Sequence, residues 1–416
     1  MFAMWNSVLM TMKVIYRQLL ERTERMTRQD EQIVLNEIEK YILHLISCSL
    51  NGGIPREKPE VCNWSEIVKL LEHNSVLNAV SPAVKRYPYE ITPEIRKKIE
   101  AALQKTVYRL LHFQVEREAI FSAMEGKGVA YLPLKGINLA EYYPIPGMRW
   151  MCDNDILYGN MENCEASDET AETLKNIMIG LGYTTEHLGL VHDVYYKKPF
   201  FNFEMHRKLF SADSPFAGYY ANPWKRAIPV SGKKCQYCFK PEDEYVFMLA
   251  HAYKHFQQSG SGIRTLVDEY AFLHANTKMD WQYIKEQLLS IGLETFEENI
   301  REAAINAFSL EGSLTEKNWE MIRYMFNCGT YGKLSIRVQN TMKRVQQEYQ
   351  LEWKDVRKKY MKERFWVKED MIKEFYPFFY RHRSIRWFLP FFRIMKGLII
   401  HPGKLYMEWK SMKESK

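Results

Sequence analysis

The sequence contains no apolar run of the length that a membrane-spanning helix requires, which is about 20 residues. The segment from Met1 to Leu20 is only moderately apolar, is interrupted by Asn6, Lys13 and Arg17, and has no basic segment in front of it. We therefore expect neither a membrane span nor a secretion signal. Internal repeats and low-complexity tracts are also absent, which argues against repeat architectures and disorder.

Cysteine is scarce: 7 residues are scattered along the chain, and the odd number does not suggest a disulfide framework. This usage predicts reduced thiols in a cytoplasmic protein. Cys235 and Cys238 form a single Cys-x-x-Cys motif, but a zinc site needs a second pair of ligands and none follows. We interpret the motif as part of a polar hairpin.

The excess of positive charge is small, since 58 Lys and Arg residues face 51 Asp and Glu residues and the net charge is +7. This balance fits binding of a polyanion such as a nucleotide, but it does not require nucleic acid. No concentrated basic stripe accompanies the motifs described below, which argues against a nucleic-acid partner. The 46% hydrophobic content is that of a globular protein.

Local patterns divide the chain into three regions: a helical region over 1–125, an α/β core over 126–240 and a helical region over 241–416. The predicted fold class is α+β, with a small mixed sheet flanked by the two helical regions. In the last region, helices are expected over 242–256, 262–275, 281–291 and 294–308.

The first region contains three helix signals. Apolar residues at helical spacing predict helix over 5–50, which Gly52 and Gly53 end. Ser65 is a candidate cap for a second helix. Thr92 followed by Pro93 predicts the start of a long helix that runs to about residue 124.

Short apolar runs in the α/β core predict strands over 129–134, 153–158, 183–186, 191–196 and 200–208. Pro133 is expected at the end of its strand, because proline cannot donate a ladder hydrogen bond. Two helices are expected, over 137–143 and over 168–181, the second with Ser167 as its cap.

Carboxylates fall on two of these strands. Because strand side chains alternate between faces, Asp153 and Asp155 would project the same way, close enough to share a divalent cation. By the same rule, Glu204 and His206 would lie on the face opposite Phe203. A glycine turn before a helix, a carboxylate pair and a later lone carboxylate are typical of metal-dependent nucleotidyl transfer.

That chemistry needs cations to neutralise the phosphates of a nucleoside triphosphate, and two Mg²⁺ ions held by carboxylates do so well. We predict Asp153, Asp155 and Glu204 as catalytic residues and metal ligands. Glu204 would complete the metal shell or accept the proton of the attacking group.

The predicted nucleotide-binding residues lie around these carboxylates. Gly136 before a helix lets backbone N–H groups approach a phosphate, and Lys135 would place a charge on the β and γ phosphates. Arg149 is a second candidate cation, and Arg264 a third if it faces the cleft. His206 completes the set, since it shares the face of Glu204.

These residues also have structural interpretations. An Asp-x-Asp pair occurs by chance in many proteins of this size, and a Lys-Gly turn is often only a turn. Glu204 would alternatively pair with Arg207 at a strand edge, and Arg264 with Asp268 along a helix.

Two further features stay open. His251 and His255 have the i, i+4 spacing of zinc ligands, but residue 252 is Ala, so packing or substrate contact are the alternatives. The tail from Tyr376 to Lys416 is rich in Arg, Lys, Phe and Trp and has few acids. It is either a membrane-surface helix or a docking helix with a solvated basic face.

At these residues the chain resembles a large uncharacterised nucleotidyltransferase family of the polymerase-beta-like superfamily. That family has an apolar strand ending in Leu-Lys-Gly, then Arg-x-x-x-Asp-x-Asp, then apolar-Glu-apolar-His. The matching residues are Leu134, Lys135, Gly136, Glu141–Tyr143, Arg149, Asp153, Asp155, Glu204 and His206. Segments 251–255 and 262–268 resemble the family's helical His/Arg/Asp segment, and the region around Tyr376, Leu389 and Arg393 is also similar.

Three positions depart from the pattern. The superfamily turn is usually Gly-Ser or Gly-Gly, and here it is Lys135-Gly136. Asn154 stands where the family usually has an apolar residue, and Tyr158 where a small aliphatic residue is commoner. None of these departures removes a predicted metal ligand.

The resemblance implies transfer of a nucleoside monophosphate from a nucleoside triphosphate to a hydroxyl or amine of a small-molecule or protein acceptor, with release of pyrophosphate. It does not name the acceptor or the base. Two rivals are a non-catalytic nucleotide-binding or antitoxin-like module on the same fold, and a basic nucleic-acid-binding protein. The retained carboxylates favour the enzyme over the first rival.

Overall fold

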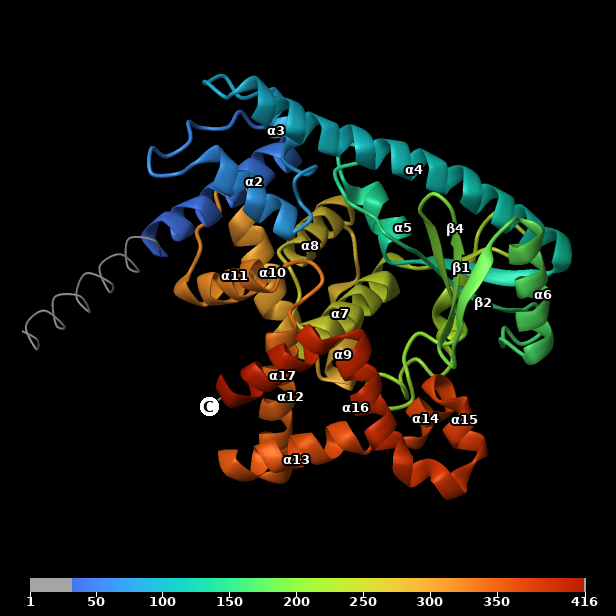
Figure 1. Ribbon diagram of the computed structural model, residues 1–416. Helices are drawn as coiled ribbons and strands as arrows, with labels where there is room; N and C mark the ends of the chain where they lie inside the picture. The colour runs from blue at the N-terminus through green and yellow to red at the C-terminus, as the bar shows by residue number, and fades with distance from the viewer. Residues whose placement is uncertain (1–31, 415–416) are drawn as a thin grey trace, which may run out of the picture.

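The computed structural model describes residues 32–414, and its central element is a mixed five-stranded sheet among helices (Figure 1). The predicted α+β class is therefore confirmed. Residues 32–51 are helical, as expected, whereas the part of that helix predicted over 5–31 lies outside the described residues. The strands of the sheet are β1 (Val129–Leu134), β2 (Asn154–Asn160), β3 (Thr184–Leu188), β4 (His192–Lys197) and β5 (Phe201–His206).

The strand order is β1-β2-β5-β4-β3, which brings β2 and β5 together from distant parts of the chain. These two strands pair in parallel, and all other pairs in the sheet are antiparallel. The parallel register places Asp155 directly opposite Glu204, and Leu157 opposite His206. The polar motifs of the two strands thus become neighbours.

Pro133 lies inside β1, opposite Ile156, and not after the strand. The strand tolerates it because β1 is the first strand of the sheet order. Tyr131, two residues earlier, donates its backbone N–H to the carbonyl of Cys235, which lies outside the sheet. Pro133 has the same orientation, so its missing donor does not interrupt the ladder with β2.

The two faces of the sheet are covered differently. One face packs on α4 (Pro93–Lys127) and α6 (Asp168–Gly180), with Tyr158 and Phe203 in that core. The other face sends Leu157 into a core shared with the C-terminal helices. Strand alternation therefore turns Asp155, Glu204 and His206 toward those helices.

Helix α4 runs from the N-terminal helices to the sheet. Its 35 residues make it about 52 Å long. Thr92 caps its start and Pro93 is its first residue, as predicted, and Gly128 ends it in the left-handed conformation with φ 66°. Its N-terminal half packs with α2 (Trp64–His73) and α3 (Ser81–Lys85).

Most predicted helices are confirmed, with small corrections at their ends. Ser167 caps α6. The cap of α2 is Asn63, whose side chain accepts from the backbone of Ser65, so the predicted Ser65 cap is wrong. The helix predicted over 137–143 is split into α5 (Gly136–Leu139) and a 3-10 turn, η1 (Ala140–Tyr142).

The helices after the sheet fall into two groups. Four of the first group confirm the prediction: α7 (Pro241–Gln258), α8 (Arg264–Ala275), α9 (Trp281–Ile291) and α10 (Glu294–Phe308). They share a core with α2, α3 and α11 (Glu316–Cys328). Before them come η2 (Pro223–Arg226) and a hairpin of β6 (Ala227–Pro229) and β7 (Tyr237–Phe239), which holds Cys238.

The second group forms a separate lobe at the bottom of Figure 1. It consists of α12 (Leu334–Tyr349), α13 (Trp353–Phe365), α14 (Glu369–Phe375), α15 (Pro377–Arg381), η3 (Arg383–Phe388), α16 (Leu389–Ile400) and α17 (Pro402–Glu414). Within residues 32–414, none of the helices combines the length and the apolarity of a membrane span.

Candidate active site

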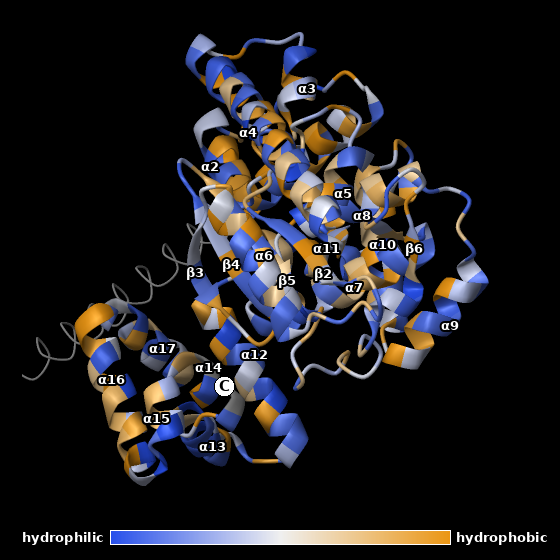
Figure 2. Ribbon diagram, turned by 90° about the vertical axis from the view of Figure 1, so that its right-hand side faces the viewer, coloured by the Kyte–Doolittle hydropathy of each residue, from blue (hydrophilic) through white to orange (hydrophobic). Residues whose placement is uncertain are grey.

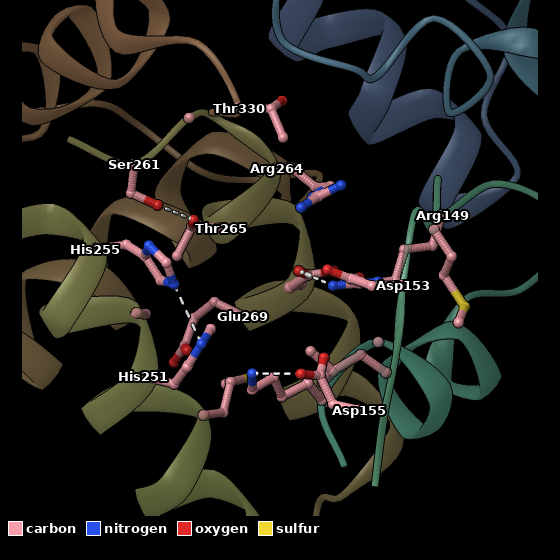
Figure 3. Close-up of a pocket in the computed structure, with 18 of the residues that line it drawn as sticks. Arg149, Asp153, Asp155, His251, His255, Ser261, Arg264, Thr265, Glu269 and Thr330 are labelled. Carbon is pink, nitrogen blue, oxygen red and sulfur yellow. Dashed lines mark hydrogen bonds and ion pairs between the residues drawn. The ribbon is translucent and has the colours of Figure 1, made fainter. Parts of the chain in front are cut away.

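A cavity of about 350 Å³ separates the polar face of the sheet from α7 and α8. Figure 3 shows His251 and His255, from α7, across this cavity from Asp153 and Asp155. Seven of the eight predicted site residues line it, and His206 reaches it through Asp155. The seven are Lys135, Gly136, Arg149, Asp153, Asp155, Glu204 and Arg264.

Asp155 is the most strongly held side chain of the site. It is buried, and its Oδ1 accepts from Lys135 Nζ at 2.7 Å and lies 2.8 Å from His206 Nε2. Burial alone would raise the pKa of Asp155, but the Lys135 ammonium and the His206 contact outweigh it. The pKa of this carboxyl therefore lies well below its usual range, and Asp155 is ionised.

Asp155, Glu204 and His206 form a compact group, in which one ligand atom of each lies within 4.8 Å of the others. Glu204 Oε2 is 3.8 Å from His206 Nε2. Burial, and then the charge of Asp155, raise the pKa of Glu204 to about 7. Two carboxylates at this spacing are stabilised by a cation between them.

Asp153 precedes β2, whereas the sequence predicted it as the first residue of that strand. It lines the cavity beside Asp155, but it lies outside the 4.8 Å group, whose third member is His206. Burial, and then the charge of Asp155, raise the pKa of Asp153. Of the three predicted metal ligands, Asp155 and Glu204 are thus the pair at closest range, and Asp153 stays a predicted ligand beside them.

The donor atoms of this group fit a hard divalent cation. The carboxylates of Asp155 and Glu204 supply oxygen ligands, which Mg²⁺ prefers, and Asp153 offers a third nearby. Lys135 is the positive group that now contacts Asp155, which shows that this oxygen attracts cations. The residues present therefore suit the metal that the resemblance implies.

The turn at Lys135 and Gly136 has an unusual backbone. Lys135 has φ 52° and ψ −118°, a conformation that side-chain-bearing residues rarely adopt. A Cβ on Gly136 would lie 2.8 Å from Arg149 Nη1, so a larger residue here would force that guanidinium to move. Helix α5 has only four residues, and its dipole is correspondingly weak.

Arg149 is fixed by an acceptor from the opposite wall. Its Nε and Nη2 donate to Asp268 Oδ1 and Oδ2 at 2.7 and 2.9 Å, and Tyr143 donates to the same carboxylate at 2.7 Å. Asp268 thus pairs with Arg149 and not with Arg264, which corrects the helical pair considered above. Arg264 donates to the carbonyl of Trp150 at 3.2 Å and keeps its place in the cavity lining.

The alternative pairing of Glu204 with Arg207 is also wrong. Arg207 forms ion pairs with Asp193 and Asp168. The nearest side chains to Glu204 Oε2 are the rings of His192 and His206, whose Nε2 atoms lie at 3.9 and 3.8 Å and whose pKa values burial lowers. Glu204 is therefore turned to the cavity.

Two histidines from α7 complete the wall. His251 Nε2 and His255 Nε2 are 3.2 Å apart, and burial lowers the pKa of both, that of His255 to about 4. Both rings are therefore neutral near pH 7, and they contact each other. No Glu or Asp stands with them in a metal-binding group within residues 32–414.

Sequence reasoning missed part of the lining. Ser259, Gly260 and Ser261 lie in the turn before α8, and the Ser-Gly-Ser-Gly pattern of 259–262 is a signal that would have found them. Trp150 and Cys152 come just before the Asp-x-Asp motif in the sequence, and this proximity could have indicated that they line the cavity. Thr330 and Tyr331 come from the α11–α12 connection, and nothing in their local sequence indicates the site.

Residues 60–308 match the family described as "Uncharacterised nucleotidyltransferase". The match covers more than half of the chain, and the chain therefore belongs to this nucleotidyltransferase family. The matched range includes every predicted site residue, from Lys135 to Arg264. No curated protein and no solved structure matches the chain.

Proposed function

We propose that the protein transfers a nucleoside monophosphate from a nucleoside triphosphate to a hydroxyl or amine of a small-molecule or protein acceptor, releasing pyrophosphate. The observation that carries this proposal is the group of Asp155, Glu204 and His206 on the cavity wall. Two Mg²⁺ ions, held by Asp155, Glu204 and Asp153, would neutralise charge on the phosphates and on the attacking group.

The cations of the cavity suit the phosphate chain. Lys135 and Arg264 line the cavity with their charged ends, and Arg149 adds a fixed positive charge that Asp268 holds in place. Lys135 contacts Asp155 in this structure, so we expect it to divide its contacts between that carboxylate and a phosphate. A triphosphate would thus meet Arg264, together with Lys135 and Arg149, which are paired with Asp155 and Asp268, within one cavity.

Glu204 is the candidate base. Without a bound cation its pKa is about 7, and a carboxylate of that pKa accepts a proton from a hydroxyl or amine more readily than an ordinary glutamate does; a Mg²⁺ beside it would lower this pKa. Glu204 lines the cavity and is only partly buried, so an acceptor can reach it. The neutral rings of His251 and His255 lie on the opposite wall, where an acceptor would contact them.

The size of the cavity bears on the acceptor. A volume of about 350 Å³ is at the lower end of the range for ligand sites and suits a nucleotide with a small acceptor group. This supports a small molecule or a single side chain over a nucleic-acid duplex.

The test uses the purified protein with Mg²⁺, each nucleoside triphosphate and a cell extract as the source of acceptor. With the label in the α-phosphate, we expect transfer of label to an acceptor and release of unlabelled pyrophosphate. With the label in the γ-phosphate, we expect all label in pyrophosphate. Transfer of the γ-label to the acceptor would overturn the proposal.

Two variants locate the activity in this site. Glu204→Gln should reduce transfer by about 10²-fold or more, and nucleotide affinity should fall far less, because Asp153 and Asp155 still hold Mg²⁺. Glu186→Gln, on exposed β3 of the same sheet, is the matched control and should keep full activity. Nucleotide binding without transfer by the unmodified protein would favour the non-catalytic module.

A further inference from the structure

The C-terminal lobe has an apolar surface that the site does not use. On α16, Phe391, Met395, Leu398 and Ile399 recur at helical spacing and are 56, 55, 51 and 75% exposed. Figure 2 shows α16 as a mostly hydrophobic helix at the outer edge of the molecule. An exposed stripe of this kind marks a binding surface.

The stripe continues onto neighbouring elements. Helix α16 packs against η3 and α17. Trp387 on η3 and Tyr406 on α17 are each 64% exposed. Trp and Tyr favour the boundary between an apolar phase and water, because one end of each ring is polar.

The charges around this surface are mostly positive, although Glu369 pairs with Arg383 and Arg386 at 3.3 and 3.2 Å. Residues 375–407 contain six Lys and Arg residues and no Asp or Glu; the six are Arg381, Arg383, Arg386, Arg393, Lys396 and Lys404. The next acid along the chain, Glu408, is held by Arg364 and by the hydroxyl of Tyr360, each at 2.8 Å. The exposed charge beside the apolar stripe is therefore mostly positive.

The combination of an apolar stripe and positive charge indicates which kind of partner this surface binds. A second copy of the chain would place the same cations against each other in an isologous contact, which is unfavourable. Single-stranded nucleic acid would match the charge and could stack on Trp387 or Tyr406, but it would leave the aliphatic side chains of Met395, Leu398 and Ile399 without an apolar partner. An anionic lipid surface matches both the cations and the aliphatic stripe.

We propose that α16, with η3 and the start of α17, lies in the plane of an anionic membrane surface. The twelve residues of α16 are about 18 Å long, and the hydrocarbon core of a bilayer is about 30 Å thick, so the helix cannot span it. Phe391, Leu398 and Ile399 insert among the acyl chains. Lys396 and Lys404 contact the headgroups. This contact does not depend on the proposed reaction.

Sedimentation of the full chain with lipid vesicles tests the proposal. At about 0.1 M salt, the protein should bind phosphatidylcholine vesicles that contain about a third phosphatidylglycerol at least about tenfold more tightly than pure phosphatidylcholine vesicles. Equal binding to both vesicles, or binding to neither, overturns the proposal. So does binding of single-stranded RNA without binding of vesicles.

Two variants with matched controls separate the contribution of the apolar side chains from that of the positive charges. The triple change Phe391→Ser, Leu398→Ser and Ile399→Ser should weaken vesicle binding at least about tenfold, whereas Leu289→Ser with Leu310→Ser should not. All five side chains are exposed, so folding should survive, and circular dichroism checks this. If the apolar triple variant instead abolishes a dimer seen by sedimentation velocity, and vesicles are never bound, the surface is a self-contact and the proposal fails.

The charge variant keeps the stripe intact. Arg381→Glu, Lys396→Glu and Lys404→Glu together should abolish the preference for phosphatidylglycerol. The control changes the net charge equally at exposed Lys225, Lys278 and Lys285, away from the C-terminal lobe. Equal loss in both variants would mean that net charge alone drives binding, which overturns the local assignment.

Discussion

Arg149 and Asp268 join the two walls of the cavity by a pair of parallel hydrogen bonds, 2.7 and 2.9 Å long, between residues 119 positions apart in the chain. Arg149 precedes the sheet carboxylates and Asp268 belongs to α8. Both side chains are about nine-tenths buried, so the pair is shielded from water. This ion pair fixes α8, which forms part of the helical wall, against the sheet.

Asp268→Asn should therefore destabilise the protein. The change leaves the Arg149 charge buried without its counter-charge, which costs about 3–5 kcal/mol. Urea unfolding measures the loss. The control is Glu316→Gln, which removes the partner of Arg323 at the surface and should cost less than about 1 kcal/mol. Equal, small losses would show that the buried pair does not hold the walls together.

Gly136→Ala tests the close approach of Arg149. The added Cβ would lie 2.8 Å from Nη1, so the guanidinium must shift and its bonds to Asp268 must distort. We expect a loss of about 1–3 kcal/mol in unfolding free energy. Gly126→Ala, in α4 with open space around the Cβ, should instead gain about 0.5–1 kcal/mol. If Gly136→Ala leaves the free energy of unfolding unchanged, then Arg149 does not approach Gly136 this closely.

Replacing Asp155 by asparagine and replacing Asp153 by asparagine should affect the stability of the protein differently. Asp155→Asn strips a buried Lys135 and His206 of their shared acceptor and should cost about 3–5 kcal/mol. Asp153→Asn removes a carboxyl whose ionised form burial disfavours, so stability should hold or rise. Thermal unfolding without added metal separates the two. A stable Asp155→Asn variant would show that the Lys135–Asp155 pair is weak.

The same two variants also probe Mg²⁺. Both carboxylates line the cavity, and we expect each Asn variant to lose Mg²⁺-dependent binding of a nucleoside triphosphate. Titration calorimetry with and without Mg²⁺ measures this at a temperature where the variants are folded. Unchanged affinity in the Asp153 variant, with loss in the Asp155 variant, would restrict the metal site to Asp155, Glu204 and His206.

The elements that local chemistry specifies were predictable. The alternation of Phe201, Phe203 and Met205 with polar residues predicted both the strand and the orientation of Glu204, and all three aromatic or apolar side chains are buried. Thr92 and Ser167 indicated helix starts because their side chains satisfy free backbone N–H groups. Asn63 and Ser65 compete for the same role two residues apart, and the sequence alone could not decide between them.

The features that the sequence did not predict depend on contacts between residues that are far apart in the chain. The parallel pairing of β2 and β5 sets Asp155 against Glu204, and it joins two strands that are separated in the chain by α6, β3 and β4. The sequence placed the start of the strand at Asp153, whereas β2 begins at Asn154. It also paired Asp268 with Arg264, its helical neighbour, because a partner 119 residues away has no local signal. The proposed roles of the site residues stay predictions.

Glu269 should make the stability of the protein depend on pH. It lines the cavity, is 1% exposed and accepts from Tyr245 at 2.6 Å. Burial raises its pKa to about 8. Between about pH 4.5 and pH 8 the folded state keeps a proton that the unfolded state has lost, so stability falls as pH rises through this window and levels off above it.

Glu269→Gln removes that ionisation and keeps an acceptor for Tyr245. Relative to the unmodified protein, the variant should be about equally stable near pH 4.5 and more stable at pH 8, by up to about 5 kcal/mol. Urea unfolding at a series of pH values gives the difference, and the exposed Glu298→Gln variant controls for the loss of one charge. A difference that does not grow between pH 5 and pH 8 would mean that Glu269 is ionised in the folded protein and is balanced by a cation in the cavity.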